Sequence, residues 1–249
     1  MVSKKGPKRH LKRYAAPAQW KLPRKVKKFV TKPSPGPHSI ENSLPLLLVV
    51  RDLLGYADNG REAKKIIKMG KILVDGVVRK DPKFPVGLMD VLSIPDTGED
   101  FLVLFDKRGR LTLKETDRRD IKLCKIKNKT VIKGGHIQLN LHDGRNQIIK
   151  VSDPTKAEED IYKTGDTVII SIPEQKLLDH IPLEEGKLAY ITGGMHIGDV
   201  ARIVSIEKRK LHPDVITLET KDGEEFKTIK DYVFVVGEEE PVLSALKNL

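Results

Sequence analysis

Five cations between residues 61 and 71 have the types and spacing needed to bind phosphate groups. Four of them recur at helical intervals, and the fifth extends the row beyond the expected end of the helix. The row consists of Arg61, Lys64, Lys65, Lys68 and Lys71. The acid within it, Glu62, stands three residues after Asn59 and is accounted for by a helix cap. Because a solvated helix usually mixes charges, this unmixed row favours a polyanion as the partner.

The surrounding residues predict a capped helix and a hairpin that hold this row in place. Asn59 suits the N-cap of the helix, and Gly70 suits its C-cap. The apolar face opposite the cations consists of Ala63, Ile66, Ile67 and Gly70. The Asp-Gly pair at 75–76 predicts a two-residue hairpin turn. Arg79 and Lys80 on the return strand add positive charge beside the helix.

Upstream of this helix, residues 43–56 predict a second, buried helix. Ser43 is a possible N-cap, Pro45 falls in the first turn and Gly55 ends the segment. We expect this helix to pack against the apolar face of the first one. Its apolar run, residues 44–50, is too short to span a bilayer, so we expect no membrane association.

The helix and hairpin together resemble the alpha-L RNA-binding motif. The matching residues are Arg61, Ala63, Ile66, Gly70, Val74, Gly76, Pro85 and Asp90. In that motif the helix and hairpin present basic side chains to structured RNA, and the resemblance implies the same for the cationic row. The motif occurs in ribosomal proteins, tRNA synthetases, pseudouridine synthases and RNA methyltransferases, so it does not distinguish among these classes.

The excess positive charge of the chain lies at its N-terminus. The net charge is +11, and residues 1–38 contain 12 of the 46 Lys and Arg residues and none of the 35 acids. This segment has too few apolar residues to fold alone, which predicts an extended arm that becomes ordered on a polyanion with strong salt dependence. Tyr14, Trp20 and Phe29 are spaced to stack on unpaired bases or to dock on a neighbouring protein. The expected RNA contacts of the arm are Lys4, Lys5, Lys8, Arg9, Lys12, Arg13, Lys21, Arg24, Lys25, Lys27 and Lys28.

From residue 97 onward the pattern is that of short β-strands separated by glycine turns. Residues 101–105 and 111–114 flank a turn with three cations, and residues 142–146 form a polar turn. The lysines of one strand alternate with apolar neighbours, which predicts that they share a face. These lysines are Lys125, Lys127 and Lys129. The expected RNA contacts of this region are Arg108, Arg110 and Arg145.

Residues 186–203 resemble the KOW motif, a short β element of ribosomal and transcription-elongation proteins. The matching residues are Gly186, Tyr190, Ile191, Gly193, Gly194, Gly198, Val200 and Ile203. Gly193, Gly194 and Gly198 permit a tight loop that brings backbone N–H groups close to a partner, and the alternative is an ordinary β-turn. The strands that follow are consistent with a small SH3-like barrel. Three acids at 238–240 are expected to begin a mobile tail.

No pattern of catalytic or metal-binding residues stands out. The seven histidines have no His or Cys partner at ligand spacing, and the single cysteine, Cys124, suits a buried position in a reducing compartment. His142 and Asp143 lack a nucleophile and favour a turn or an RNA contact. The Gly-Arg-Leu sequence at 109–111 resembles that of pseudouridine synthases, but Thr112 stands where their catalytic aspartate would be. We therefore expect no catalysis, cofactor, metal or small-molecule substrate.

The order of these parts along the chain resembles the archaeal and eukaryotic small-subunit ribosomal protein four-e family, and the short C-terminus favours its archaeal members. We expect an α+β, multidomain chain with a basic arm (1–41), an alpha-L domain (42–96), a central β domain (97–176), an SH3-like KOW barrel (177–240) and a tail (241–249). The resemblance implies a non-catalytic constituent of the cytoplasmic ribosome. Its partners would be small-subunit ribosomal RNA and neighbouring ribosomal proteins. Two alternatives remain open: an RNA-modifying enzyme with an alpha-L motif, and a KOW-containing transcription or assembly factor.

Overall fold

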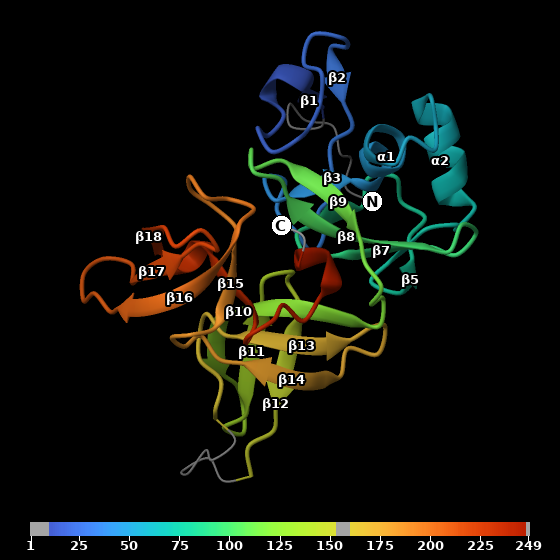
Figure 1. The fold of residues 1–249 in the computed structure, drawn as a ribbon. Coiled ribbons are helices and arrows are strands. Elements are labelled where there is room, and N and C mark those ends of the chain that lie inside the picture. Colours follow the sequence, from blue (N-terminus) through green and yellow to red (C-terminus); the bar gives the residue numbers. More distant parts are fainter. Residues whose placement is uncertain (1–9, 153–159, 248–249) are drawn as a thin grey trace. The chain divides into compact units, whose positions relative to one another are not determined.

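The computed structural model describes residues 10–152 and 160–247, and it is mostly β with few helices (Figure 1). The chain forms two compact units. The first extends to residue 104 and includes residues 110–115, and the second contains residues 105–109 and the chain from 116 onward. Among the described residues, no helix combines the length and apolarity needed to cross a membrane.

The elements up to residue 115 are short. They are β1 (Leu11–Lys12), η1 (Arg13–Ala15), β2 (Phe29–Val30), β3 (Ser43–Pro45), α1 (Leu46–Leu48), η2 (Val49–Leu53), α2 (Gly60–Lys68), β4 (Leu73–Val74), β5 (Val77–Val78), β6 (Pro85–Gly87), β7 (Val91–Ile94), β8 (Glu99–Phe105) and β9 (Leu111–Glu115). Two strand pairs, β1-β2 and β3-β6, accompany a five-stranded sheet in the order β5-β4-β7-β8-β9.

The remaining elements form two further five-stranded sheets. They are β10 (Ile121–Val131), β11 (Ile137–Leu141), β12 (Asn146–Ile149), β13 (Thr167–Ser171), β14 (Leu177–Ile181), β15 (Leu188–Ile191), β16 (Val200–Glu207), β17 (Val215–Glu219), β18 (Glu225–Ile229), η3 (Lys230–Tyr232), β19 (Val233–Gly237) and η4 (Ser244–Leu246). The central sheet has the order β12-β11-β10-β13-β14, and the C-terminal sheet has the order β18-β17-β16-β15-β19.

The predicted helix and hairpin of the alpha-L motif are confirmed. The Asn59 side chain accepts hydrogen bonds from the backbone N–H groups of Arg61 (2.9 Å) and Glu62 (3.1 Å) and caps α2. Gly70 follows the helix with a φ of 76°, which favours glycine. Asp75 and Gly76 have φ values of 51° and 69°, the conformation that a two-residue hairpin turn requires.

The predicted helix over residues 43–56 begins later than expected. Ser43–Pro45 form strand β3, which pairs with β6, and the helix starts at Leu46. The Ser43 hydroxyl donates a hydrogen bond to the Ser39 carbonyl (2.7 Å), so it does not cap the helix. A wide turn of π-helix follows at Val49–Leu53. Periodicity could not reveal β3, because its partner strand lies some 40 residues further along the chain.

The N-terminal segment is folded from residue 10 onward, which corrects the expectation of an extended arm. Strand β1 pairs with β2, and the side chain of Trp20 is only 2% exposed. The backbone N–H of Leu111 in β9 donates to the Gln19 carbonyl (2.9 Å) and ties the segment to the first sheet. The segment contains few apolar residues, but the burial of one large aromatic side chain stabilises it. Trp20 is a core residue and not a platform for unpaired bases.

The expected domain boundaries at 96/97 and 176/177 both fall within sheets. Strand β8 pairs with β7, with Leu92 opposite Phe101, although it was expected to belong to the central β domain. Likewise β14 pairs with β13, with Val168 opposite His180. In both cases the expected boundary falls at a hairpin turn that joins two strands of one sheet. Short hairpin turns and short linkers share the same residue types, so composition does not separate them.

The C-terminal residues up to 247 pack against the C-terminal sheet and do not begin a mobile tail at 238–240. The side chains of Leu243 and Leu246 are fully buried. The backbone N–H of Val242 donates to the Val236 carbonyl (2.9 Å). Two buried leucines thus hold a segment whose preceding acids had suggested disorder.

Candidate nucleic-acid interface

Helix α2 presents its cations to solvent and its apolar side chains to the core. Ala63 and Ile67 are fully buried, and the helix cannot turn without exposing them. The cations of the helix are all exposed. They are Arg61, Lys64, Lys65 and Lys68. The cap and the two buried side chains therefore hold the row of positive charge in a fixed position. Only a folded polyanion whose phosphate groups have a matching spacing can contact the whole row.

The cations that flank α2 are less free. The Lys71 ammonium lies 2.6 Å from the Asp96 carboxylate, with both side chains about half exposed. Arg79 is half-buried, with its guanidinium carbon 4.4 Å from the centre of the Phe84 ring. Lys80 is exposed. Of the three cations, only Lys80 is exposed and has, among the described residues, neither an ion pair like that of Lys71 nor a ring contact like that of Arg79.

The predicted contacts of the N-terminal segment divide into two groups. Lys4, Lys5, Lys8 and Arg9 lie outside the described residues. Five lysines of the described part are exposed, and they are Lys12, Lys21, Lys25, Lys27 and Lys28. Tyr14 and Phe29 are also exposed, at 68% and 50%, so two of the three predicted aromatic contacts remain available to a partner.

Both arginines of the described N-terminal segment bind backbone carbonyl groups. Arg13 is buried at 4% exposure and donates from Nη1 to the Pro23 carbonyl (2.6 Å). Arg24 donates to the carbonyls of Tyr14 (3.0 Å), Ala16 (3.0 Å) and Pro17 (3.2 Å). A guanidinium can satisfy several carbonyls at once because its five N–H donors are held in a plane. These two side chains hold the segment together and are poor candidates for phosphate contacts.

The three arginines predicted in the central region differ in exposure. Arg108 is exposed and Arg110 is half-buried. Arg145 lies 3.3 Å from the buried carboxylate of Asp143, which also pairs with the fully buried ammonium of Lys122 at 3.2 Å. Burial alone raises the pKa of Asp143, but the charges of Lys122, His142 and Arg145 outweigh it and hold the pKa below its ordinary value. The positive charge of Arg145 is thus largely committed within the protein.

The lysines expected to share one strand face do not do so. A register shift between Ile126 and Asn128 interrupts the alternation of β10. Lys125 donates to the carbonyls of Lys230 (3.0 Å), Asp231 (2.9 Å) and Val233 (2.7 Å), and burial lowers its pKa to about 8. Lys129 pairs with Asp160 at 2.6 Å, and Lys127 alone is exposed. A bulge cannot be inferred from alternation because it adds one residue without changing the sequence pattern.

The glycine-rich loop of the KOW-like segment is packed against other parts of its own unit. A Cβ atom at Gly193 would lie 2.5 Å from the Tyr232 ring, and one at Gly198 would lie 2.9 Å from the Asp106 backbone. Gly194 and Gly198 have φ values of 88° and 90°. The backbone N–H of Gly198 donates to the Ile191 carbonyl (2.9 Å). These contacts explain why glycine is required here by the fold itself.

One cluster has the geometry of possible metal ligands. Donor atoms of Cys124, His142 and Asp143 all lie within 4.8 Å of one another. However, Nδ1 of His142 accepts a hydrogen bond from the Lys125 backbone N–H (3.3 Å), and Asp143 is already paired with two cations. A bound cation would therefore meet the buried Lys122 ammonium at close range. The donor set fits a hydrogen-bonded core network better than a metal centre.

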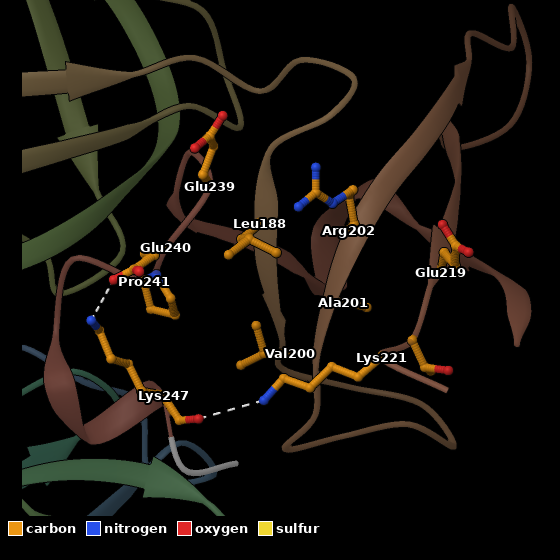
Figure 2. A pocket seen from close by; sticks show the side chains of 11 residues that line it. Leu188, Val200, Ala201, Arg202, Glu219, Lys221, Glu239, Glu240, Pro241 and Lys247 are labelled. Carbon is orange, nitrogen blue, oxygen red and sulfur yellow. Dashed lines mark hydrogen bonds and ion pairs between the residues drawn. The ribbon is translucent and has the colours of Figure 1, made fainter. Parts of the chain in front are cut away.

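A pocket beside the C-terminal sheet has a mixed lining. It has a volume of about 470 Å³ and lies beside β15, β16 and the chain after β19 (Figure 2). Apolar Leu188 and Val200 lie among charged groups of both signs, and Lys247 forms an ion pair with Glu240. The Lys221 ammonium donates to the Lys247 carbonyl (3.4 Å). The residues that line this pocket do not include a paired nucleophile and base.

Sequence reasoning left three exposed lysines out of the candidate interface, although a signal for them was present. Lys127, Lys133 and Lys150 lie in the ribbon of β10, β11 and β12. Between residues 126 and 150 there are five Lys and Arg residues and a single acid, Asp143, which is buried. Counting charge over this window, in place of single motifs, would have identified a second basic region.

Comparison with known proteins assigns the chain to a family. Three family models match: the S4e ribosomal family over residues 97–177, the RS4NT (NUC023) domain over 5–41, and the S4 domain over 46–92.

Curated relatives match along nearly the whole chain. The small ribosomal subunit protein eS4 of Methanocaldococcus jannaschii is 71% identical over 97% of this chain and 99% of its own length. The same protein of Methanococcus maripaludis strain C6 is 70% identical over 96% of this chain and 98% of its own length. The crystal structure of the 30S ribosomal protein S4e from Thermoplasma acidophilum has a TM-score of 0.67 and 35% identity, and the match covers 79% of this chain and 96% of that one. The chain therefore belongs to the S4e family of ribosomal proteins.

Proposed function

We propose that this protein is a structural constituent of the small ribosomal subunit of the cytoplasmic ribosome in an archaeon. It would bind ribosomal RNA, contact neighbouring ribosomal proteins and support subunit assembly and translation without catalysis. The observation that carries the proposal is 71% identity over nearly the full length to a small ribosomal subunit protein. The exposed cations of α2 supply a physical means of binding RNA.

The proposed mode of binding uses two kinds of basic surface. The row on α2 is held by a capped helix, so it contacts phosphates at fixed positions and orients the protein on folded RNA. The exposed lysines of the N-terminal segment add attraction that depends on counterion release. Phosphate contacts of this kind position a protein without reading sequence.

The finer domain layout is part of the proposal. We place a basic segment at 1–41 and an alpha-L domain from 42, with the pairing of β8 and β9 in the first sheet supporting a boundary near 115. A central β domain would follow to about 181, because β14 belongs to the central sheet. The C-terminal sheet would be the SH3-like KOW barrel, which its five strands and glycine loop support.

Co-sedimentation with small ribosomal subunits at moderate salt tests the proposal. We expect the protein to be recovered with small subunits, whereas recovery with RNA polymerase or with free RNA would favour a transcription factor or an RNA-modifying enzyme. Incubating the protein with uridine-containing ribosomal RNA and looking for modified nucleotides provides a second, independent check. Modification of the RNA by the purified protein would overturn the non-catalytic assignment.

Replacement of Lys64, Lys65 and Lys68 by Gln tests the role of α2. We expect weaker binding to a transcript of small-subunit ribosomal RNA, with a salt slope lower by about 2 to 3. The circular dichroism spectrum and unfolding temperature should stay unchanged, because all three side chains are exposed. An unchanged affinity and slope would remove α2 from the interface.

A further inference from the structure

The central sheet carries a partly exposed face on which five of six side chains are neutral and polar. The backbone register places Asn128, Asn140 and Asn146 directly opposite one another on β10, β11 and β12. A second row, two residues along each strand, consists of Thr130, Gln138 and Ile148. Residues directly opposite, and residues two apart on one strand, project from the same face. We call these six residues the amide face.

On the opposite face, the side chains of the middle strand β11 lie in the hydrophobic core, whereas Val131 at the end of β10 is 73% exposed. Ile137 and Leu139 have 2% and 0% exposure and belong to the core cluster of the central sheet. Each of the six side chains of the amide face is exposed or half-buried. Strand β12 forms one edge of the sheet, and β14 forms the other. The core fixes the register, and the amide face is therefore rigidly presented.

The side chains of this face are arranged for hydrogen bonding. The Gln138 amide nitrogen donates a hydrogen bond to Oδ1 of Asn140 (3.0 Å). This bond uses one N–H of Gln138 and does not use the amide nitrogen of Asn140. Each amide offers both donors and acceptors. None of the six side chains is aromatic or charged, which does not suit stacking on unpaired bases or binding of phosphates.

The surroundings of the face are positively charged. The ribbon from 126 to 150 contains five cations, and its single acid is buried against Lys122. Three of these cations, Lys127, Lys133 and Lys150, are exposed. A polyanion is thus attracted to the ribbon, although the centre of the face is neutral. A protein partner is less suited, because Ile148 is the one apolar side chain of the face and a protein interface needs an apolar centre.

We propose that the amide face binds the minor groove of a ribosomal RNA helix, with the flanking lysines on its phosphates. The minor groove of A-form RNA is wide and shallow, and it presents ribose 2′-hydroxyls that both donate and accept hydrogen bonds. A sheet face lined with short amides matches that surface in shape and in hydrogen-bonding groups. This inference rests on the proposed function, and it assigns the central domain a mode of RNA binding that differs from that of α2.

Binding of the full-length protein to an in vitro transcript of the small-subunit ribosomal RNA of Methanocaldococcus jannaschii tests the inference. The double variant Gln138→Ala/Asn140→Ala should bind about tenfold more weakly, since it removes hydrogen bonds worth about 1 kcal/mol or less each. Its salt slope should equal that of the wild type because no cation is removed. The variant Lys127→Ala/Lys150→Ala should instead lower the slope by about 1.5 to 2.

A matched control comes from the same ribbon. Gln147 lies on β12 opposite Leu139 and therefore on the other face, so Gln147→Ala should leave RNA binding unchanged. The nearly isosteric Asn140→Asp should weaken binding more than Asn140→Ala, because it places a negative charge against RNA without changing the shape. The unfolding temperatures of all variants are measured in parallel, and Asn140→Asp keeps the test decisive if the double variant is unstable.

Acylation of ribose 2′-hydroxyls in the bound transcript gives a second readout. The wild-type protein should protect consecutive riboses of one helix from acylation. The variant Gln138→Ala/Asn140→Ala should lose this protection and keep the protection of other riboses. The inference is overturned if this variant binds like Gln147→Ala, or if no ribose differs in acylation between it and the wild type. If the wild type does not bind the transcript at all, the proposed function and the inference fail together. Normal wild-type binding with an unaffected double variant overturns the inference only.

Discussion

The N-terminal segment and helix α2 are both basic, but they use their cations differently. On α2 every cation is exposed and the helix is anchored by Ala63 and Ile67. In the N-terminal segment Arg13 and Arg24 bind carbonyl groups of the protein, while the neighbouring lysines remain exposed. The number of cations in a segment therefore does not measure the charge available to a partner. Arginine binds carbonyl groups within the fold because its planar guanidinium can donate to several acceptors at once.

The amide face adds a third kind of surface. It has no charge of its own, yet it lies within a ribbon that is nearly free of exposed acids. Charged rows attract a polyanion from a distance and are weakened by salt, whereas amide contacts act only at close range and resist salt. In a protein with both kinds of surface, the charged rows would attract the RNA and the amide contacts would fix its position.

The largest expected effect concerns the core of the N-terminal segment. Trp20→Ala should lower the local free energy of unfolding of this segment by about 3 to 5 kcal/mol, because it removes a large buried side chain. Hydrogen exchange of the Leu111 backbone N–H, which donates to Gln19, should accelerate accordingly. Tyr14→Ala is the control, since that side chain is 68% exposed. Unchanged exchange at Leu111 in the Trp20 variant would mean that the segment is held by other contacts.

The next prediction separates available cations from committed ones. Replacement of Lys25, Lys27 and Lys28 by Gln should lower the salt slope of binding to ribosomal RNA by about 2 to 3, the same decrease that we expect for the three substitutions on α2. Replacement of Arg24 by the neutral Gln should leave the slope unchanged, because this side chain binds three carbonyls within the protein. A slope that falls with the Arg24 variant would break the distinction between the two groups.

A smaller effect on stability is expected for Arg24→Lys. A lysine ammonium cannot reach three carbonyls in the same plane, so the segment should lose about 1 to 2 kcal/mol. Fluorescence of Trp20, the single tryptophan of the chain, reports the change, and its emission should shift to the red on mild heating before that of the wild type. Lys25→Gln is the matched control one residue away. Identical melting of the two variants would show that the carbonyl contacts add little.

A pH dependence of stability is expected in the second unit. Burial lowers the pKa of Lys125 to about 8, below its ordinary value of 10.5. Between these values the unfolded chain binds more protons than the folded one, so the free energy of unfolding gains a contribution that rises with pH. Lys125→Met should abolish this contribution, and the difference between wild type and variant in chemical denaturation at pH 7.5 to 10 measures it. A wild-type contribution that falls with pH would show that the three carbonyls outweigh burial.

Features encoded within a few residues of one another could be predicted from the sequence. The cap at Asn59, the end of α2 at Gly70 and the turn at 75–76 each depend on local conformational preferences, and each is confirmed. The exposed row on α2 follows from the same local logic, since the apolar positions of the helix decide which side faces the core.

Features that depend on distant partners could not be predicted. Strand β3 exists because β6 pairs with it, and the segment that contains the buried Trp20 is bonded to the distant Leu111 through Gln19. The bulge in β10 redirects Lys125, Lys127 and Lys129 without any change in alternation. The amide face requires three strands in one register, and the three asparagines at 128, 140 and 146 share no visible period along the chain.

The cationic helix and the acid-free basic N-terminus could be recognised in the sequence, because charge and local backbone preference are properties of neighbouring residues. The fold, however, determines which cations remain exposed to a partner. Arg13 and Arg24 in the N-terminal segment, and Lys125 in β10, bind carbonyl groups that come within reach only in the folded chain. A carbonyl that is partly shielded from water is stabilised by a strong donor nearby in space, whatever the distance between the two along the chain.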